Sequence, residues 1–189
     1  MEYERIILGI DPGTTIMGYG LLGINGKKAT MLSMGYIDLT KLNDHYSKLK
    51  HIYDRVEAIV KNYKPTEMAI ESPFMGENAQ SALKLGRAQG TAMIVALNYK
   101  IPIYEYAPTK IKMAITGNGS AGKQQISKLL QHIFKIETMP SKFDASDGLA
   151  AAYCHFLQPA IDTGKPGQKK KKSGSWKDFI SQNPNRIRK

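Results

Sequence analysis

The chain has 189 residues, 42% of them hydrophobic, and a formal net charge of +11 at pH 7. This length suits one domain with a sizeable core, and no apolar run is long enough to span a bilayer. Cys154 is the only cysteine, which excludes an intrachain disulfide and favours a reducing, cytoplasmic setting. The acidic start has no signal-peptide layout, so we expect none.

The positive charge is distributed unevenly along the chain. Residues 159–189 hold nine Lys or Arg against two Asp, so +7 of the net +11 lies in this stretch. Its Gly, Pro and Lys content predicts a flexible basic tail behind a domain formed by residues 1–158. A charge of this sign favours a polyanionic partner, most commonly nucleic acid, and Lys169 to Lys172 are expected to add non-specific DNA affinity.

The first third of the chain predicts three strands. An apolar run at residues 6–10 leads directly into Asp11 and then into a Pro-Gly turn. Because no polar residue alternates with the apolar ones, this strand is expected to be buried on both faces. Residues 18–22 and 29–37 predict two further strands, and Asn25-Gly26 between them is a strong hairpin signal. The chain therefore opens with a predicted antiparallel meander.

The rest of the chain predicts helices that alternate with short strands. Apolar residues three or four positions apart indicate the helices, and one strand ends in Glu71 followed by a Ser-Pro turn, much as the first strand ends in Asp11. Gly86 and Gly90 lie in a predicted helix, where they cost helix stability and allow another helix to approach closely. The expected elements are helix 43–63, strand 68–70, helix 78–99, strand 101–106, and helices 108–117, 123–134 and 144–157.

Four carboxylates occupy comparable places in this pattern. Asp11 and Glu71 end predicted strands, whereas Asp144 and Asp147 open the last helix, on one face. Because strand ends and helix starts meet at one edge of an α/β sheet, all four are expected to converge. Converging carboxylates repel each other unless a cation lies among them, and Mg²⁺ prefers oxygen ligands. Taken singly, Asp144 is an ordinary helix cap and Asp147 a favourable first-turn acid, so the prediction depends on their joint occurrence.

Motifs in a characteristic order run from about residue 5 to residue 157. They are Ile7-Leu-Gly-Ile-Asp-Pro-Gly13 with Gly18-Tyr-Gly20, Ala69-Ile-Glu71, Phe74-Met75, Asn78-Ala79 with Ser81-Ala-Leu-Lys-Leu-Gly86, Glu105-Tyr-Ala107, Lys112, Gly119-Ser-Ala121 with Lys123, and Asp144-Ala-Ser-Asp147-Gly-Leu-Ala150. In these motifs the chain resembles the RuvC-type Holliday-junction resolvases of the RNase H-like nuclease superfamily. The tail from residue 159 matches no motif of that family.

The resemblance implies an α/β fold, with a five-stranded mixed sheet flanked by helices on both faces, in a protein that acts as a homodimer. It implies that two Mg²⁺ ions, for which Mn²⁺ substitutes, are held by Asp11 as a shared ligand and by Glu71, Asp144 and Asp147. The two subunits would nick opposing strands of a four-way DNA junction symmetrically, leaving 5′-phosphate and 3′-hydroxyl ends. Recombination and repair, with RuvA and RuvB as branch-migration partners, is the implied setting.

The resemblance also implies contacts with DNA and with a second subunit. Phe74 would stack on an unpaired base, and Lys112 and Lys123 would contact the phosphate backbone near the cut. Ordinary alternatives are loop packing for the aromatic ring and a solvated surface for the lysines. Residues 79–90 resemble the family's dimer helix, with close packing inside one subunit as the alternative. The implied interface residues are Ala82, Leu85, Gly86 and Gly90.

Three rival functions are weaker. Gly117 to Lys123 fits the front of a P-loop, but Gln124 replaces the Ser or Thr that would bind Mg²⁺, and a predicted helix precedes it. Asp11 to Thr15 resembles the first phosphate loop of actin- and sugar-kinase-type ATPases, which need two such domains, and 189 residues are too few for two. A non-enzymatic nucleic-acid-binding protein acting through charge would gain nothing from four acids that repel phosphate.

Overall fold

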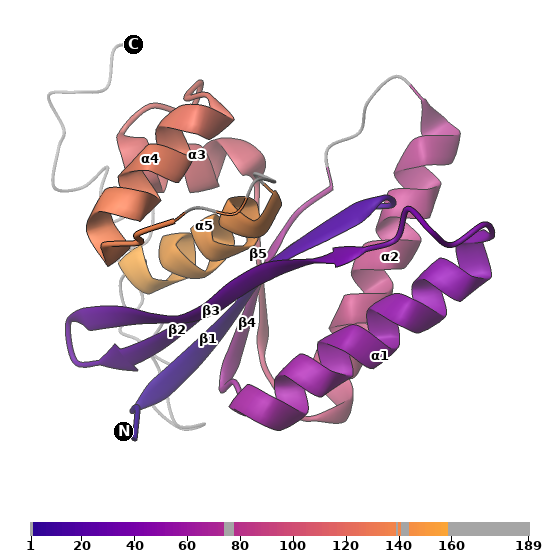
Figure 1. Cartoon of the computed structure of the whole chain (residues 1–189), viewed down its shortest axis with the longest axis horizontal. Helices are drawn as coiled ribbons and strands as arrows, with labels where there is room; N and C mark the ends of the chain where they lie inside the picture. The colour runs from indigo at the N-terminus through magenta and orange to yellow at the C-terminus, as the bar shows by residue number, and fades with distance from the viewer. Residues whose placement is uncertain (1, 74–77, 139, 141–143, 159–189) are drawn as a thin grey trace, which may run out of the picture. The chain divides into compact units, whose positions relative to one another are not determined.

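Five strands form one mixed sheet with helices on both faces in the computed structural model, which describes residues 2–73, 78–138, 140 and 144–158 (Figure 1). The predictions for Phe74 and for residues 159–189 lie outside these ranges. The strands are β1 (Arg5–Asp11), β2 (Ile16–Asn25), β3 (Lys28–Asp38), β4 (Glu67–Glu71) and β5 (Ile103–Tyr106). The helices are α1 (His45–Tyr63), α2 (Ala79–Asn98), α3 (Pro108–Thr116), α4 (Lys123–Phe134) and α5 (Asp144–Leu157).

The sheet has the strand order β3-β2-β1-β4-β5. The first three strands pair antiparallel, which confirms the predicted meander, whereas β4 and β5 join it in parallel pairing. The β2 and β3 strands are longer than the sequence pattern indicates. Asn25 is the last residue of β2 and pairs with Lys28, so the turn consists of Gly26, at φ 57°, and Lys27 rather than of Asn25 and Gly26.

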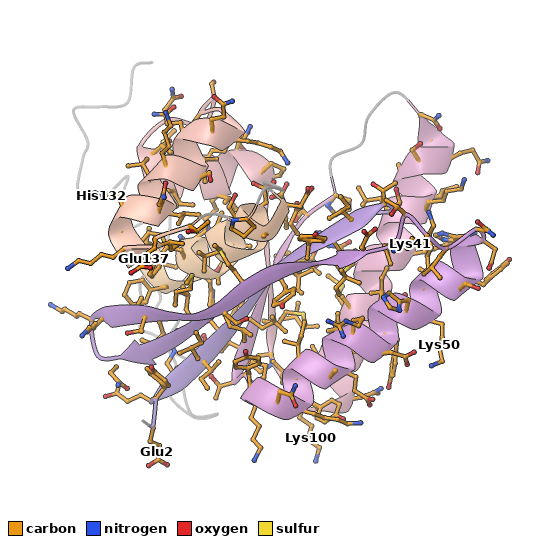
Figure 2. All side chains as sticks on the ribbon, in the orientation of Figure 1. Glu2, Lys41, Lys50, Lys100, His132 and Glu137 are labelled. Atoms are coloured by element: carbon orange, nitrogen blue, oxygen red, sulfur yellow. The ribbon has the colours of Figure 1, made fainter. Side chains whose placement is uncertain are left out.

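The helices form two layers, α1 and α2 on one face of the sheet and α3, α4 and α5 on the other (Figure 1). Side chains of β1 point alternately to the two faces of the sheet. Leu8 and Ile10 enter the core under α1 and α2, whereas Ile7 enters the core on the opposite face. The strand is thus buried on both faces, as its apolar run predicts. Side chains fill the space between the sheet and the helices on both faces, whereas charged residues such as Lys50 and Lys100 point outward (Figure 2). No helix of the described ranges is long and apolar enough to cross a membrane.

Helix α5 lies unusually close to the sheet because glycines face each other at the contact. A Cβ atom on Gly20 would lie 2.3 Å from the Cα of Leu149, and one on Gly148 would lie 2.5 Å from the backbone nitrogen of Tyr19. Gly9 packs under the same helix, where a Cβ would lie 2.1 Å from the Gly148 carbonyl oxygen. Every residue from 145 to 152 is buried, so α5 is a central helix of the core. Its depth fixes where its first turn, with Asp144, meets the sheet.

Candidate active site

The carboxyl ends of β1 and β4 bring two acids to one edge of the sheet. Asp11 is the last residue of β1 and Glu71 the last of β4. The two strands run parallel, with Ile10 paired to Ile70, so the acids follow equivalent positions of neighbouring strands. This is the convergence that their places after two apolar runs predict.

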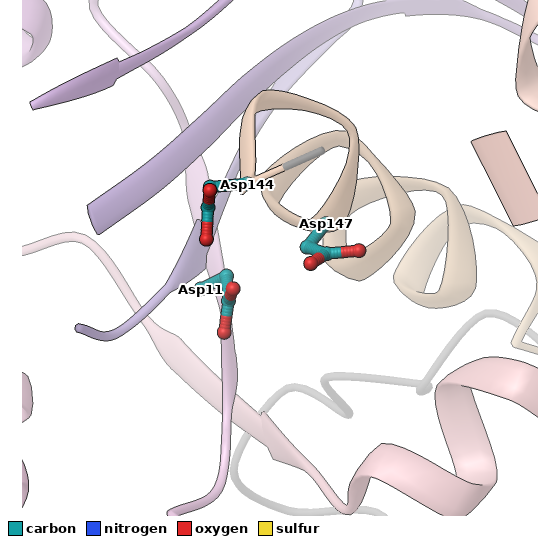
Figure 3. A group of neighbouring side chains, drawn as sticks. All are labelled: Asp11, Asp144 and Asp147. Atoms are coloured by element: carbon teal, nitrogen blue, oxygen red, sulfur yellow. The ribbon is translucent and has the colours of Figure 1, made fainter. Parts of the chain in front are cut away.

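The first turn of α5 adds two more acids at this edge. Asp144 is the first residue of the helix, and Asp147 lies one turn further on. Gly18, which pairs with Asp11, leaves the room for this approach, since a Cβ there would clash with the Asp144 carbonyl oxygen. Carboxylate oxygens of Asp11, Asp144 and Asp147 all lie within 4.8 Å of one another (Figure 3). We call these three residues the aspartate cluster.

Glu71 lies at the same site, on the wall of a cavity. It lines this cavity of about 150 Å³ together with Asp11 and Asp147 of the aspartate cluster and with Lys112 and Lys123. Within the described residues, the tight group consists of the three aspartates, and Glu71 faces the cavity next to them. The four predicted acids therefore share one site, but three of them form its compact part.

Burial and mutual repulsion make the charged forms of these acids costly. Burial, with help from Glu71 and Asp147, raises the pKa of Asp11 to about 8. Burial and the nearby Asp147 carboxylate raise the pKa of Glu71 to about 7. Burial also raises the pKa of Asp147, although its hydrogen bond to Lys123 opposes this effect. Such a set of crowded carboxylate oxygens fits a hard divalent cation, which would supply the missing positive charge.

Two lysines supply the positive charge of the cavity. The Lys123 Nζ donates a hydrogen bond to Asp147 Oδ2 at 2.5 Å. Burial is the largest single influence on Lys123 and lowers its pKa, but the hydrogen bond to Asp147 and the charges of the aspartate cluster together outweigh it, so the pKa of Lys123 is raised and the charged ammonium is favoured. Lys112 lines the cavity as well. Helix α3, not a strand, precedes residues 117–123, and Lys123 bonds to an acid, so this segment lacks the context of a P-loop.

Two further side chains hold the backbone at the site and were not singled out from the sequence. The Lys48 Nζ, on α1, donates to the Thr14 carbonyl oxygen at 3.2 Å, in the loop after Asp11. The buried Gln89, on α2, donates to the Glu71 carbonyl oxygen at 3.4 Å. A lysine on a helix surface gives no signal in a sequence. Gln89 gives a faint one, as a polar residue beside Ala88 on the buried side of an amphipathic helix.

Comparisons with known proteins give a consistent result. A family model described as "Crossover junction endodeoxyribonuclease RuvC" matches residues 7–155. The protein of that name from Bacteroides fragilis is 59% identical over 98% of this chain and 97% of its own length. The one from Christiangramia forsetii is 52% identical over 100% and 95%. A solved structure of T. thermophilus RuvC in complex with a Holliday junction substrate matches with a TM-score of 0.75 and 26% identity, over 82% of this chain and 94% of that one.

Proposed function

The chain belongs to the RuvC family of crossover junction endodeoxyribonucleases, and from this premise we propose that its four converging acids are the active site of a Holliday-junction resolvase. The protein is a metal-dependent nuclease of that family. The observation that carries the site assignment is the aspartate cluster, whose carboxylate oxygens lie within 4.8 Å of one another beside the cavity that Glu71 lines.

We propose Mg²⁺ as the metal, with Mn²⁺ as a substitute, and two ions for each active site. Asp11 would be the shared ligand, as the family resemblance implies and as its charge interactions with Glu71, Asp147 and Asp144 support. When bound, such ions would supply Lewis-acid stabilisation of the phosphodiester and would lower the pKa of a water molecule. The protein's part is to hold four carboxylates in one place, at the ends of two strands and of one helix.

The remaining residues of the cavity act on the DNA. Lys112 and Lys123 place two ammonium groups in the cavity, where they would bind the backbone phosphate and offset the negative charge of the transition state. Lys123 also holds Asp147 in position through its hydrogen bond. The products would be a 5′ phosphate and a 3′ hydroxyl. We further propose that Phe74, which lies outside the described residues, stacks on an unpaired base of the junction.

An exposed apolar face of α2 supports a homodimer. Leu83, Ile94 and Leu97 on this helix are about half exposed, at 57%, 49% and 57%. Among the described residues, nothing lies within 4 Å of a Cβ built on Gly86 or Gly90, so these glycines are not explained by packing inside one subunit. We assign this face to a second copy of the chain, and we also propose the half-buried Ala82 and Leu85, which the resemblance implies, as interface residues. Two copies would cut two opposing strands symmetrically.

The dimer assignment predicts that Leu83→Glu separates the subunits, because a charge would be buried in an apolar interface. The variant is expected to be a monomer in light scattering at micromolar protein, and to lose paired nicking of the junction. Ile133→Glu places the same charge on α4, at a residue that is 39% exposed, and should leave the molecular mass unchanged. If the molecular mass of Leu83→Glu in solution were unchanged from wild type, this face of α2 would not be the dimer interface.

We also propose the cellular setting from the family. Residues 1–158 would act as the nuclease domain and residues 159–189 as a basic tail that adds DNA affinity. The resemblance points to cooperation with RuvA and RuvB in the cytoplasm, where recombination intermediates of bacterial DNA lie. The single cysteine, Cys154, is buried and unpaired, as a reducing compartment allows.

The decisive experiment compares a labelled four-way junction with a linear duplex of the same sequence, each with Mg²⁺ and with EDTA. We expect paired, symmetrical nicks in the junction alone, and none with EDTA. Equal cutting of both DNAs would support nuclease activity but would reject selectivity for the junction. Tight junction binding without any cutting would favour a non-enzymatic DNA-binding protein, in which the four acids have only structural roles.

A further inference from the structure

We infer that Gln89 is a positioning residue for Glu71, an inference that rests on the proposed role of Glu71 as a metal ligand. Gln89 lies on α2 and is 6% exposed. Its Nε2 donates to the Glu71 carbonyl oxygen at 3.4 Å and to Glu105 Oε2 at 3.2 Å. An amide nitrogen carries two hydrogens, so each of these bonds uses one. The Glu105 carboxylate thereby aims the amide at the end of β4.

The peptide group after Glu71 is held from two sides. Its carbonyl oxygen, on Glu71, accepts the bond from Gln89, and its N–H, on Ser72, donates to the Tyr106 carbonyl oxygen at 2.9 Å. Because a peptide group is planar, two bonds at its two ends fix its orientation. One bond comes from helix α2 and the other from strand β5. The direction of the chain at the last residue of β4 is thus set by two separate elements.

Glu71 needs such support more than the two aspartates of α5 do. Asp144 and Asp147 belong to a helix whose depth is fixed by glycine contacts with the sheet. Glu71 ends its strand, and its side chain has one more rotatable bond than an aspartate. Its carboxylate faces Asp147 across a buried site. A fixed backbone at Glu71 therefore keeps its carboxylate at the cavity, so that Gln89 acts on metal binding through Glu71 without touching metal or DNA.

The first test compares Gln89→Met with Gln131→Met. Methionine keeps the length of the side chain and loses the amide hydrogens. Gln131 is the matched control, because its Nε2 also donates to a backbone carbonyl, that of Ile136 at 3.2 Å, but at the end of α4 away from Lys123. We expect the Mg²⁺ concentration for a half-maximal thermal shift to rise about tenfold in Gln89→Met and to stay unchanged in Gln131→Met. The Mg²⁺ requirement for cleavage should rise in parallel.

The second test separates positioning from general stability. Gln89→Glu removes both amide hydrogens and places two carboxylates together, and adding Glu105→Gln restores one hydrogen bond between residues 89 and 105. The double variant should regain folding stability but keep the weakened Mg²⁺ affinity, because the Glu71 carbonyl still has no donor. Recovery of both properties together would show a structural role alone and overturn the inference.

The outcomes also separate this inference from the proposed function. A wild-type chain that shows a Mg²⁺-dependent thermal shift and cuts the junction supports the proposed function. If Gln89→Met then binds Mg²⁺ with unchanged affinity, only the positioning role of Gln89 is rejected. A wild-type chain without any Mg²⁺-dependent shift would overturn both. Circular dichroism of each variant, recorded before the titration, establishes that it is folded.

Discussion

Asp11→Asn is expected to reduce junction cleavage by at least about 10³-fold and to leave junction binding near the wild-type level. Asparagine has almost the same shape, but it lacks the charge that would hold a divalent ion between the other acids. Asp11 is the acid whose loss affects the whole site, since its carboxyl interacts with the charges of all three other acids, Glu71, Asp147 and Asp144. Single-turnover cleavage and a binding titration in EDTA measure the two effects separately, and retained cleavage would reject the assignment.

The same substitution should stabilise the metal-free protein at alkaline pH. The pKa of Asp11 is raised from 3.8 to about 8, so charging it costs free energy in the folded state. A neutral Asp11 in the folded state therefore contributes stability that is fully present below the unfolded-state pKa of 3.8. That contribution is lost as pH rises through the folded-state pKa of about 8. In EDTA at pH 8 we therefore expect a free energy of unfolding higher by on the order of 2 kcal/mol in Asp11→Asn than in wild type, and a smaller difference at pH 5.

Urea unfolding at the two pH values measures this effect, and Asp54→Asn is the control. Asp54 is an exposed acid on α1 that pairs with Lys50 at 2.6 Å, so its replacement should change stability little at either pH. If Asp11→Asn were no more stable than wild type in EDTA at pH 8, repulsion among the acids would not be the cost that a cation compensates. A stabilised but inactive variant would show that the site is maintained for function at the expense of stability.

Most of the site was predictable because its acids lie at boundaries that a sequence marks clearly. Asp11 and Glu71 each follow an apolar run and precede a proline turn, and neighbouring parallel strands then bring them to one edge. Asp144 and Asp147 follow from helix spacing. The division into three clustered aspartates and one glutamate on the cavity wall was not predictable, because it depends on how far each side chain reaches.

The contacts that the sequence pattern missed are all between distant segments. Periodicity predicts that residues 78–99 form a helix, and α2 confirms this, but it does not say that Gln89 meets the ends of two strands. Lys123 was predicted to contact phosphate, and its hydrogen bond to Asp147 joins residues 24 positions apart. The predicted bounds of the second and third strands, 18–22 and 29–37, were too short, because pairing rather than local preference extends β2 to Asn25 and starts β3 at Lys28.

Gly148→Ala is expected to lower the free energy of unfolding by about 3 kcal/mol and to impair cleavage at the same time. The added methyl group would lie 2.5 Å from backbone atoms of Tyr19, and backbone cannot move aside as a flexible side chain can. Helix α5 would have to lift from β2, and its first turn, with Asp144 and Asp147, would move with it. Urea denaturation measures the stability loss.

Gly119→Ala makes the same chemical change where space is available, since the nearest atom to a Cβ there is the Thr109 carbonyl oxygen at 3.5 Å, an ordinary contact distance. Its free energy of unfolding should stay within about 1 kcal/mol of wild type. If Gly148→Ala were equally harmless, the depth of α5 on the sheet would not depend on the facing glycines. Full cleavage by a Gly148→Ala protein that is clearly destabilised would show that Asp144 and Asp147 do not depend on the depth of α5, and that other contacts, such as the Lys123–Asp147 hydrogen bond, keep them in place.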